Sequence, residues 1–260
     1  MAFGTGAVIR GILGLQVGIA LALLAGDFFA ILPDLLTDRR TNAPALDAPV
    51  RPGDQTRRFD PRTLPADRVS PSRPGIQMPA GSPDMPTELT FTAAETPGRY
   101  LISGEIQPGD AARYADWRAS LPTPPEVLVL HSPGGSVGDA LAIGRQIRAE
   151  AIDTAMEATG VCLSACPYML MAGTERVIAR GAWVGVHQHY YGESTVLPAF
   201  LAVKDIQLSQ AEVVAYLDGM GIDLRLMKHS LATPPEDIYI LLDEELTEYN
   251  VATELTGGES

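Results

Sequence analysis

Positive charge, cysteine and aromatic residues are all scarce in this sequence. Of its 260 residues, 19 are Lys or Arg against 32 Asp or Glu, and only 6% are aromatic. The acidic excess lies in residues 88–260, where no basic stripe occurs. Such a domain repels nucleic acid, so nucleic-acid-binding functions are excluded. The sequence also has no nucleotide-binding motif and no His/Cys cluster, so we expect neither a metal nor another cofactor.

The two cysteines, Cys162 and Cys166, are four residues apart at the start of a predicted helix. Residues at this spacing in a regular helix have Cα atoms about 6 Å apart, which is within disulfide range. Two interpretations are therefore open. In an oxidising compartment a bridge would fix the backbone around Ser164. Otherwise both cysteines are small, buried apolar side chains.

The N-terminus has the length and composition of a membrane segment. Residues 11–26 carry no charge, and the apolar run continues past Asp27. A helix over residues 7–32 would exceed the ~20 residues that a span requires. A cleaved signal peptide is the alternative, but a clean small-x-small cleavage site is missing. We therefore expect an uncleaved signal-anchor in residues 1–40, which with the cysteine pair predicts an inner-membrane protein whose domain lies in the periplasm.

A proline-rich segment separates this anchor from the rest of the chain. Residues 41–87 contain ten prolines and very few large apolar residues. Such a segment cannot bury enough surface to offset the entropy of ordering it, so we predict a disordered tether. The globular domain is expected over residues 88–255, followed by a disordered tail over residues 256–260.

Within residues 88–255, apolar runs of strand length alternate with stretches of helical length. This alternation predicts an α/β domain with a parallel sheet built from βαβ units. The predicted strands are residues 89–92, 100–103, 126–131, 153–158, 176–179 and 182–186. The predicted helices are residues 110–120, 139–151, 164–171, 194–217 and 224–231.

Three short segments carry residues suited to nucleophilic catalysis. The first is a Ser-Pro-Gly-Gly turn after a buried strand, where Gly134 and Gly135 let a substrate carbonyl approach their N–H groups. The second, Gly-Val-Cys-Leu-Ser-Ala, puts Ser164 at a helix start, whose dipole favours a developing oxyanion. The third, Val-Gly-Val-His-Gln, ends a strand with His187, an imidazole able to accept the serine proton.

In order and spacing, these segments resemble those of the ClpP-like serine peptidases of the Clp-protease/crotonase superfold, closest to their membrane-anchored or periplasmic branch. The resemblance implies a superhelical stack of βαβ units, with Ser164 as nucleophile and His187 as general base. It also implies an oxyanion hole formed by the N–H of Gly134 or Gly135 and that of Ala165. Peptide or protein substrates follow from the resemblance, as does a homo-oligomer packed through the helix after the histidine.

The family's third catalytic residue is an acid that orients the histidine, and here its position is apolar. That position falls near Ile238, so the neighbouring Asp237 is our candidate for the role, with Asp243 a weaker one. Without an acid, the site would be a Ser–His dyad or a degenerate relic. A Ser–Lys mechanism would need Lys204 or Lys228, the only lysines, and no family motif surrounds either.

Each of these residues also has a purely structural interpretation. The glycine turn suits many strand-to-helix connections, Ser164 suits an N-cap, and His187 suits a hydrogen-bonded core position. Their combination favours a serine peptidase acting by Ser–His–Asp chemistry. Two other functions stay open: a non-catalytic scaffold or peptide-binding protein, and a crotonase-like acyl-CoA enzyme that uses the glycine turn without Ser164.

Overall fold

The computed structural model describes residues 10, 13–22, 56–59, 85–189 and 199–257. The chain forms two units, Met1–Pro49 and Val50–Ser260. In the first unit, residues 13–22 are helical. No helix in the described part of the chain is both long and apolar enough to cross a bilayer. Much of the anchor expected over residues 7–32 lies outside the described residues.

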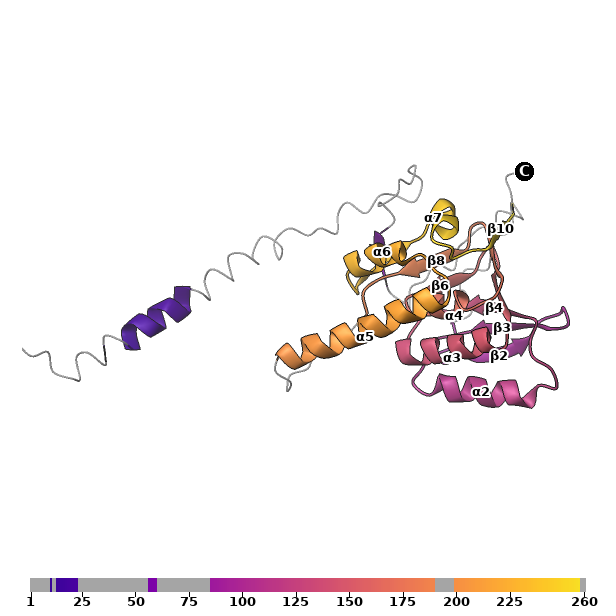
Figure 1. Cartoon of the computed structure of the whole chain (residues 1–260), viewed down its shortest axis with the longest axis horizontal. Helices are drawn as coiled ribbons and strands as arrows, with labels where there is room; N and C mark the ends of the chain where they lie inside the picture. The colour runs from indigo at the N-terminus through magenta and orange to yellow at the C-terminus, as the bar shows by residue number, and fades with distance from the viewer. Residues whose placement is uncertain (1–9, 11–12, 23–55, 60–84, 190–198, 258–260) are drawn as a thin grey trace, which may run out of the picture. The chain divides into compact units, whose positions relative to one another are not determined.

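The Val50–Ser260 unit is a mixed α/β structure built on two sheets (Figure 1). The larger sheet has six described strands in the order β10-β7-β5-β4-β3-β2. All run parallel except β2, which pairs antiparallel with β3 at one edge. The strands are β2 (Thr90–Ala93), β3 (Arg99–Ser103), β4 (Val127–His131), β5 (Asp153–Met156), β7 (Arg176–Ala179) and β10 (Glu254–Thr256).

The smaller sheet has four described strands in the order β1-β9-β8-β6. These are β1 (Thr56–Arg58), β6 (Val161–Leu163), β8 (Trp183–Val186) and β9 (Asp237–Ile240). Strands β6 and β8 are parallel, whereas β9 is antiparallel to both β8 and β1. A parallel bridge between Ser132 and Cys162 joins the two sheets where β4 ends.

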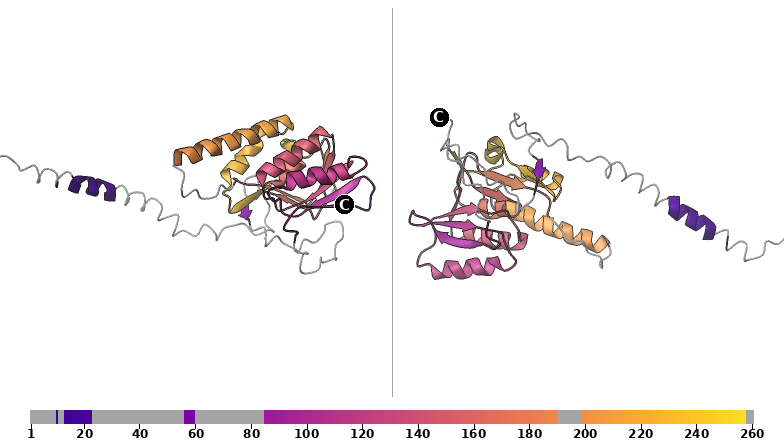
Figure 2. Two further views of the ribbon diagram at one scale, coloured as in Figure 1. Left: turned by 90° about the horizontal axis from the view of Figure 1, so that it is seen from below. Right: turned by 180° about the vertical axis from the view of Figure 1, so that it is seen from behind.

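Helices cover the larger sheet and lead away from it. Helices α2 and α3 pack side by side along this sheet, and α3 also packs on α4 (Figures 1 and 2). One end of α5 projects from the body of the unit in all three views. The helices are α2 (Asp110–Ser120), α3 (Val137–Ala149), α4 (Cys166–Leu170), α5 (Ala199–Gly219), a 3-10 turn (Leu224–Leu226), α6 (Met227–Ala232) and α7 (Asp243–Glu248).

A tyrosine of α5 connects this long helix to the core behind the predicted nucleophile. The hydroxyl of Tyr216 donates a 2.6 Å hydrogen bond to the carbonyl of Tyr168 in α4. Gly144 of α3 makes room for it, because a Cβ there would lie 1.8 Å from the hydroxyl oxygen. The three helices are therefore fixed to one another at one point.

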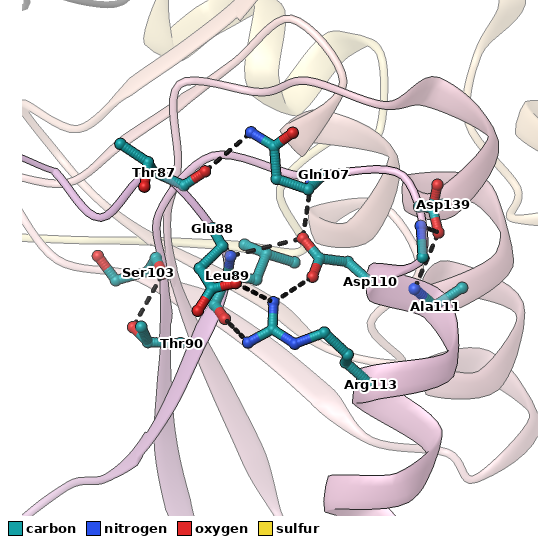
Figure 3. A network of polar contacts seen from close by, with 11 residues as sticks. Thr87, Glu88, Leu89, Thr90, Ser103, Gln107, Asp110, Ala111, Arg113 and Asp139 are labelled. Atoms are coloured by element: carbon teal, nitrogen blue, oxygen red, sulfur yellow. Dashed lines mark hydrogen bonds and ion pairs between the residues drawn. The ribbon is translucent and has the colours of Figure 1, made fainter.

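A buried carboxylate fixes the beginning of the domain (Figure 3). Asp110, which is 0% exposed, accepts hydrogen bonds from the N–H groups of Leu89 and Gln107. Arg113, one helical turn further on, pairs with the same carboxylate and donates to the carbonyl of Leu89. These contacts tie α2 to the chain that enters β2.

The structure confirms the predicted α/β class and its parallel strands. The helix over residues 110–120 and the strand over residues 176–179 have the predicted bounds. One difference lies in the segment predicted to be a disordered tether, because Thr56–Arg58 form a strand there. The edge of β9 supplies the backbone partners that make this strand stable, and no pattern within the segment reveals them.

Replacing the carboxylate of Asp110 should destabilise the domain. Asp110→Ala leaves two backbone N–H groups without their acceptor and removes one of the two ion pairs described for Arg113, so we expect the free energy of unfolding to fall by about 2–3 kcal/mol. Urea unfolding followed by circular dichroism measures this. Asp116→Ala, at an exposed position of the same helix, is the control and should change stability by less than ~0.5 kcal/mol. Equal effects of the two substitutions would contradict the role of Asp110.

Candidate active site

Ser164 stands in a strained turn between β6 and α4. Its φ is 59°, in the left-handed region that side chains other than glycine rarely adopt. Its N–H donates a 2.9 Å hydrogen bond to the carbonyl of Gly185, which holds the turn against β8. In the segment from residue 160 to residue 173, Ser164 alone is not buried. Strain of this kind concentrates at functional sites, and here it presents one hydroxyl to solvent.

His187 lies beside this hydroxyl because strands β6 and β8 are neighbours. The register pairs Leu163 with Gly185, so the residues that follow the two strands emerge at the same edge. The Nε2 atom of His187 is 2.7 Å from the Oγ atom of Ser164. The structure therefore brings the predicted nucleophile and base into hydrogen-bond contact.

The other ring nitrogen of His187 faces a backbone carbonyl. Its Nδ1 atom lies 2.9 Å from the carbonyl oxygen of Pro235. A carbonyl only accepts, so Nδ1 carries the proton of the neutral imidazole and Nε2 presents a lone pair to the serine hydroxyl. This is the tautomer that a general base requires.

The geometry does not support Asp237 as the orienting acid. The Nδ1 atom of His187 faces the carbonyl of Pro235. Asp237 is the first residue of β9 and is paired through the backbone with Arg58. The apolar Ile238 that follows points into the small core under the sheet, with 3% exposure. Asp243 is also elsewhere, in an ion pair with Arg180.

Burial favours the neutral form of the candidate base. His187 is 8% exposed, and desolvation lowers its pKa below the usual histidine value, while the hydrogen bond to Pro235 acts in the opposite direction. The ring of Phe59 covers it at a centroid distance of 4.9 Å. His189 follows two residues later, and its Nε2 is 2.7 Å from the hydroxyl of Tyr168, which gives it a separate partner.

The glycine turn after β4 is packed against the serine turn. Ser132 donates from its N–H to the carbonyl of Val161 and accepts from the N–H of Leu163. Gly134, with φ 99°, comes so close that a Cβ would lie 2.5 Å from the Cβ of Ser164. The close approach therefore requires glycine at this position.

Two backbone N–H groups are suited to bind an oxyanion here. The N–H of Gly134 donates to the hydroxyl of Ser132 at 3.1 Å. Gly134 therefore allows the two turns to approach each other, and its N–H is not the one suited to bind an oxyanion. On either side of Gly135, the carbonyl of Gly134 accepts from the N–H of Ile106, and the N–H of Ser136 donates to the carbonyl of Ile106. Among the described residues, the N–H groups of Gly135 and Ala165 have no acceptor. An N–H left unpaired at a buried residue such as Ala165 is costly, and a substrate oxyanion would satisfy it.

A disulfide between Cys162 and Cys166 encloses the serine turn. Both cysteines are 0% exposed, and Ser164 lies midway between them in the sequence. The bridge closes a short loop across the end of β6 and the first residue of α4. It thereby limits the backbone conformations of the residue whose φ is strained.

The serine and histidine open into a cleft of about 690 Å³. No lysine or arginine lines it among the described residues, and two glutamates do. Its lining is Phe59, Glu105, Pro133, Gly134, Gly135, Ser136, Val137, Ser164, His187, His189, Ser209, Pro235 and Glu236.

A second pocket, of about 280 Å³, is also lined by His187. It shares His187 and His189 with the cleft, and its remaining lining is largely apolar. These residues are Tyr168, Gln188, Ile206, Gln210, Val213, Met227, Ser230 and Leu231.

A side chain at residue 134 should disrupt the site. In Gly134→Ala the new Cβ would also lie 2.5 Å from the carbonyl oxygen of Leu163, at a φ unfavourable for alanine, so we expect a loss of about 1–3 kcal/mol in unfolding free energy. Gly138→Ala is the control, because α3 leaves a Cβ there without contacts. This control should be neutral or stabilising by up to about 1 kcal/mol in chemical unfolding. A Gly134→Ala protein as stable as the control would contradict the packing described.

The site thus combines a strained serine, a histidine in the tautomer of a base, and two unpaired N–H groups beside an open cleft. Sequence reasoning found Ser164, His187, Gly135 and Ala165, but not the carbonyl of Pro235 or the ring of Phe59. A carbonyl has no side-chain signature, whereas Phe59 was visible as the single aromatic residue among the prolines of residues 41–87. A scan against protein-family models finds no match for this chain, and a search of curated proteins finds none either.

Proposed function

We propose that this protein is a serine peptidase of the ClpP-like kind, with Ser164 as nucleophile and His187 as general base. The observation that carries the proposal is the 2.7 Å contact between Ser164 Oγ and His187 Nε2, with Nδ1 held by an acceptor. The two sheets with their mainly parallel strands support a superhelical arrangement of βαβ units of the Clp-protease/crotonase type. The Pro235 carbonyl takes the place of the usual acid.

The proposed reaction follows from the positions of these groups. The hydroxyl of Ser164 gives its proton to Nε2 as Oγ attacks the scissile carbonyl carbon. The resulting oxyanion accepts hydrogen bonds from Gly135 and Ala165, each typically contributing about 3 kcal/mol. His187 returns the proton to the departing amine, the C–N bond breaks, and an acyl-serine remains. A water molecule that gives its proton to His187 then hydrolyses the ester and restores Ser164.

Two features weigh against the alternative functions. An acyl-CoA enzyme would bind a phosphate-bearing cofactor, yet the described lining of the cleft contains two glutamates and no lysine or arginine. A non-catalytic scaffold would need neither the strained φ of Ser164 nor an unpaired N–H at Ala165. Both features have a use in acyl transfer.

The lining of the two pockets indicates the class of peptide. Glu105 and Glu236 would repel acidic side chains in the main cleft. The second pocket offers an apolar side chain a place beside His187.

The disulfide around Ser164 supports action in an oxidising, extracytoplasmic compartment, as the proposed membrane anchor does.

Labelling with a fluorophosphonate probe tests the nucleophile. The wild-type protein should be labelled, and Ser164→Ala and His187→Gln should abolish or nearly abolish labelling. The rate should rise with pH and reach half its maximum below ~6.5, because burial lowers the pKa of His187 and only the neutral imidazole accepts a proton.

The matched control is Ser209→Ala, another of the three serines that line the cleft in the described residues, which should keep normal labelling. Labelling that survives Ser164→Ala would reject the proposed nucleophile. A folded wild-type protein with no labelling would favour a non-catalytic role.

Substitution of Asp237 distinguishes a carbonyl-oriented base from a complete triad. Asp237→Asn should change the labelling rate by less than about tenfold, because the tautomer of His187 depends on Pro235. In a triad, the same change at the acid costs about 10⁴-fold. A loss of that size, measured with the probe at neutral pH in a protein of unchanged thermal stability, would restore Asp237 as the third catalytic residue.

A further inference from the structure

The segment that precedes the domain contributes a strand to the edge of the active-site sheet. Strand β1 pairs antiparallel with β9, with Thr56 opposite Tyr239 and Arg58 opposite Asp237. The ladder continues one residue further, where the N–H of Phe59 donates a 2.8 Å hydrogen bond to the carbonyl of Glu236. This last bond is adjacent to Pro235, whose carbonyl faces His187.

The turn that carries this carbonyl has few hydrogen bonds of its own. Pro234 and Pro235 lack an N–H, so neither can donate to the backbone around it. The N–H of Asp237 closes the turn on the carbonyl of Pro234 at 3.0 Å. On the other side of the proline pair, the N–H of Gln188 donates to the carbonyl of Thr233 at 2.9 Å. The bond from Phe59 to Glu236 is thus one of the few that fix the turn from outside.

The side chain of Phe59 acts on the same histidine. Its ring lies 4.9 Å from the ring of His187, tilted by 57°, and both rings line the cleft. It also packs with the small core formed by Val161, Leu163, Ile238 and Ile240. One residue therefore fixes the turn through its backbone and covers the imidazole through its ring.

We propose that Phe59, with strand β1, is a positioning element of the active site, which holds the Pro235 carbonyl and the imidazole of His187 in the geometry of a general base. The proposal rests on the function proposed above. It assigns the segment before the domain a part in catalysis, in addition to any part in tethering. Because the described partner of His187 Nδ1 is the Pro235 carbonyl, this backbone clamp supplies the fixed orientation that the base needs.

The charged and titratable groups near His187 come from several elements. His189 follows it on its own segment, Glu105 lines the cleft from the loop after β3, and Glu236 precedes β9. Asp237 begins β9 itself. A substitution at Phe59 leaves all four in place, so it isolates the effect of covering the ring. Deleting the whole segment would also remove Arg57 and Arg58, and for this reason point variants are preferable.

Three full-length variants separate the two contributions of Phe59. Phe59→Ala removes the ring and keeps the N–H, Phe59→Pro removes both, and Phe59→Leu keeps an apolar cover. We expect fluorophosphonate labelling of Ser164 at neutral pH to fall about tenfold in Phe59→Ala, toward 100-fold in Phe59→Pro, and little in Phe59→Leu. Thr92→Ala, at an exposed position of edge strand β2 in the larger sheet, is the control and should leave the rate unchanged.

A second measurement does not depend on hydrolase activity. Nuclear magnetic resonance of the imidazole nitrogens, with His187→Gln to assign the signal, follows the titration of His187. Exposing the ring in Phe59→Ala should raise the pKa of His187 toward the usual value, because desolvation is the main cause that lowers it. The acid limb of labelling should move to higher pH by the same amount.

The outcomes distinguish this inference from the proposed function. Faster labelling in Phe59→Ala would show that Phe59 obstructs the cleft and would overturn the positioning role. An unchanged rate and an unchanged titration of His187 in a folded variant would overturn it too. If the wild-type protein is never labelled but the titration shifts in Phe59→Ala, the proposed function fails while the contact of Phe59 with His187 stands.

Discussion

The pairing of Ser132 with β6 is the contact on which the rest of the site depends. Ser132 donates to the carbonyl of Val161 at 2.8 Å and accepts from the N–H of Leu163 at 3.1 Å. These two bonds continue β4 of the larger sheet as a neighbour of β6 in the smaller one. The glycine turn after β4 consequently lies against the serine turn after β6. Each sheet alone would hold only half of the candidate site, so the site and the two-sheet architecture form together.

A neutral group orients the candidate base, and this affects its chemistry. The Pro235 carbonyl fixes the tautomer of His187 as a carboxylate would, because it can only accept. It carries no full charge to stabilise the imidazolium, so burial prevails and the pKa of His187 falls. A lower pKa extends the neutral form of the imidazole to more acidic pH, but it also makes the imidazole a weaker proton acceptor. The arrangement therefore increases the fraction of neutral imidazole at the expense of its proton affinity.

Side chains with a chemical signature could be predicted from the sequence, and groups without one could not. Ser164 and His187 are recognisable because nucleophile and base are side chains in short motifs, and the helix over residues 110–120 follows from local pattern. The Pro235 carbonyl belongs to the backbone and has no recognisable side chain, and its position depends on how β9 pairs with β8. Strand β1 forms on the edge that β9 offers. The sequence therefore predicts the α/β class and the candidate Ser–His pair, and long-range strand pairing decides what orients the histidine.

The conformation of Ser164 gives a reason for the contacts that surround it. A left-handed φ costs a side-chain-bearing residue about 1–2 kcal/mol, so the turn would relax unless its neighbours held it. The carbonyl of Gly185 holds its N–H, Gly134 packs against its Cβ, and the disulfide of Cys162 and Cys166 closes the loop around it. A purely structural serine would give no reason for three independent restraints. Their convergence on one hydroxyl is what a nucleophile requires, because its oxygen must stay in place while the base and the oxyanion donors act.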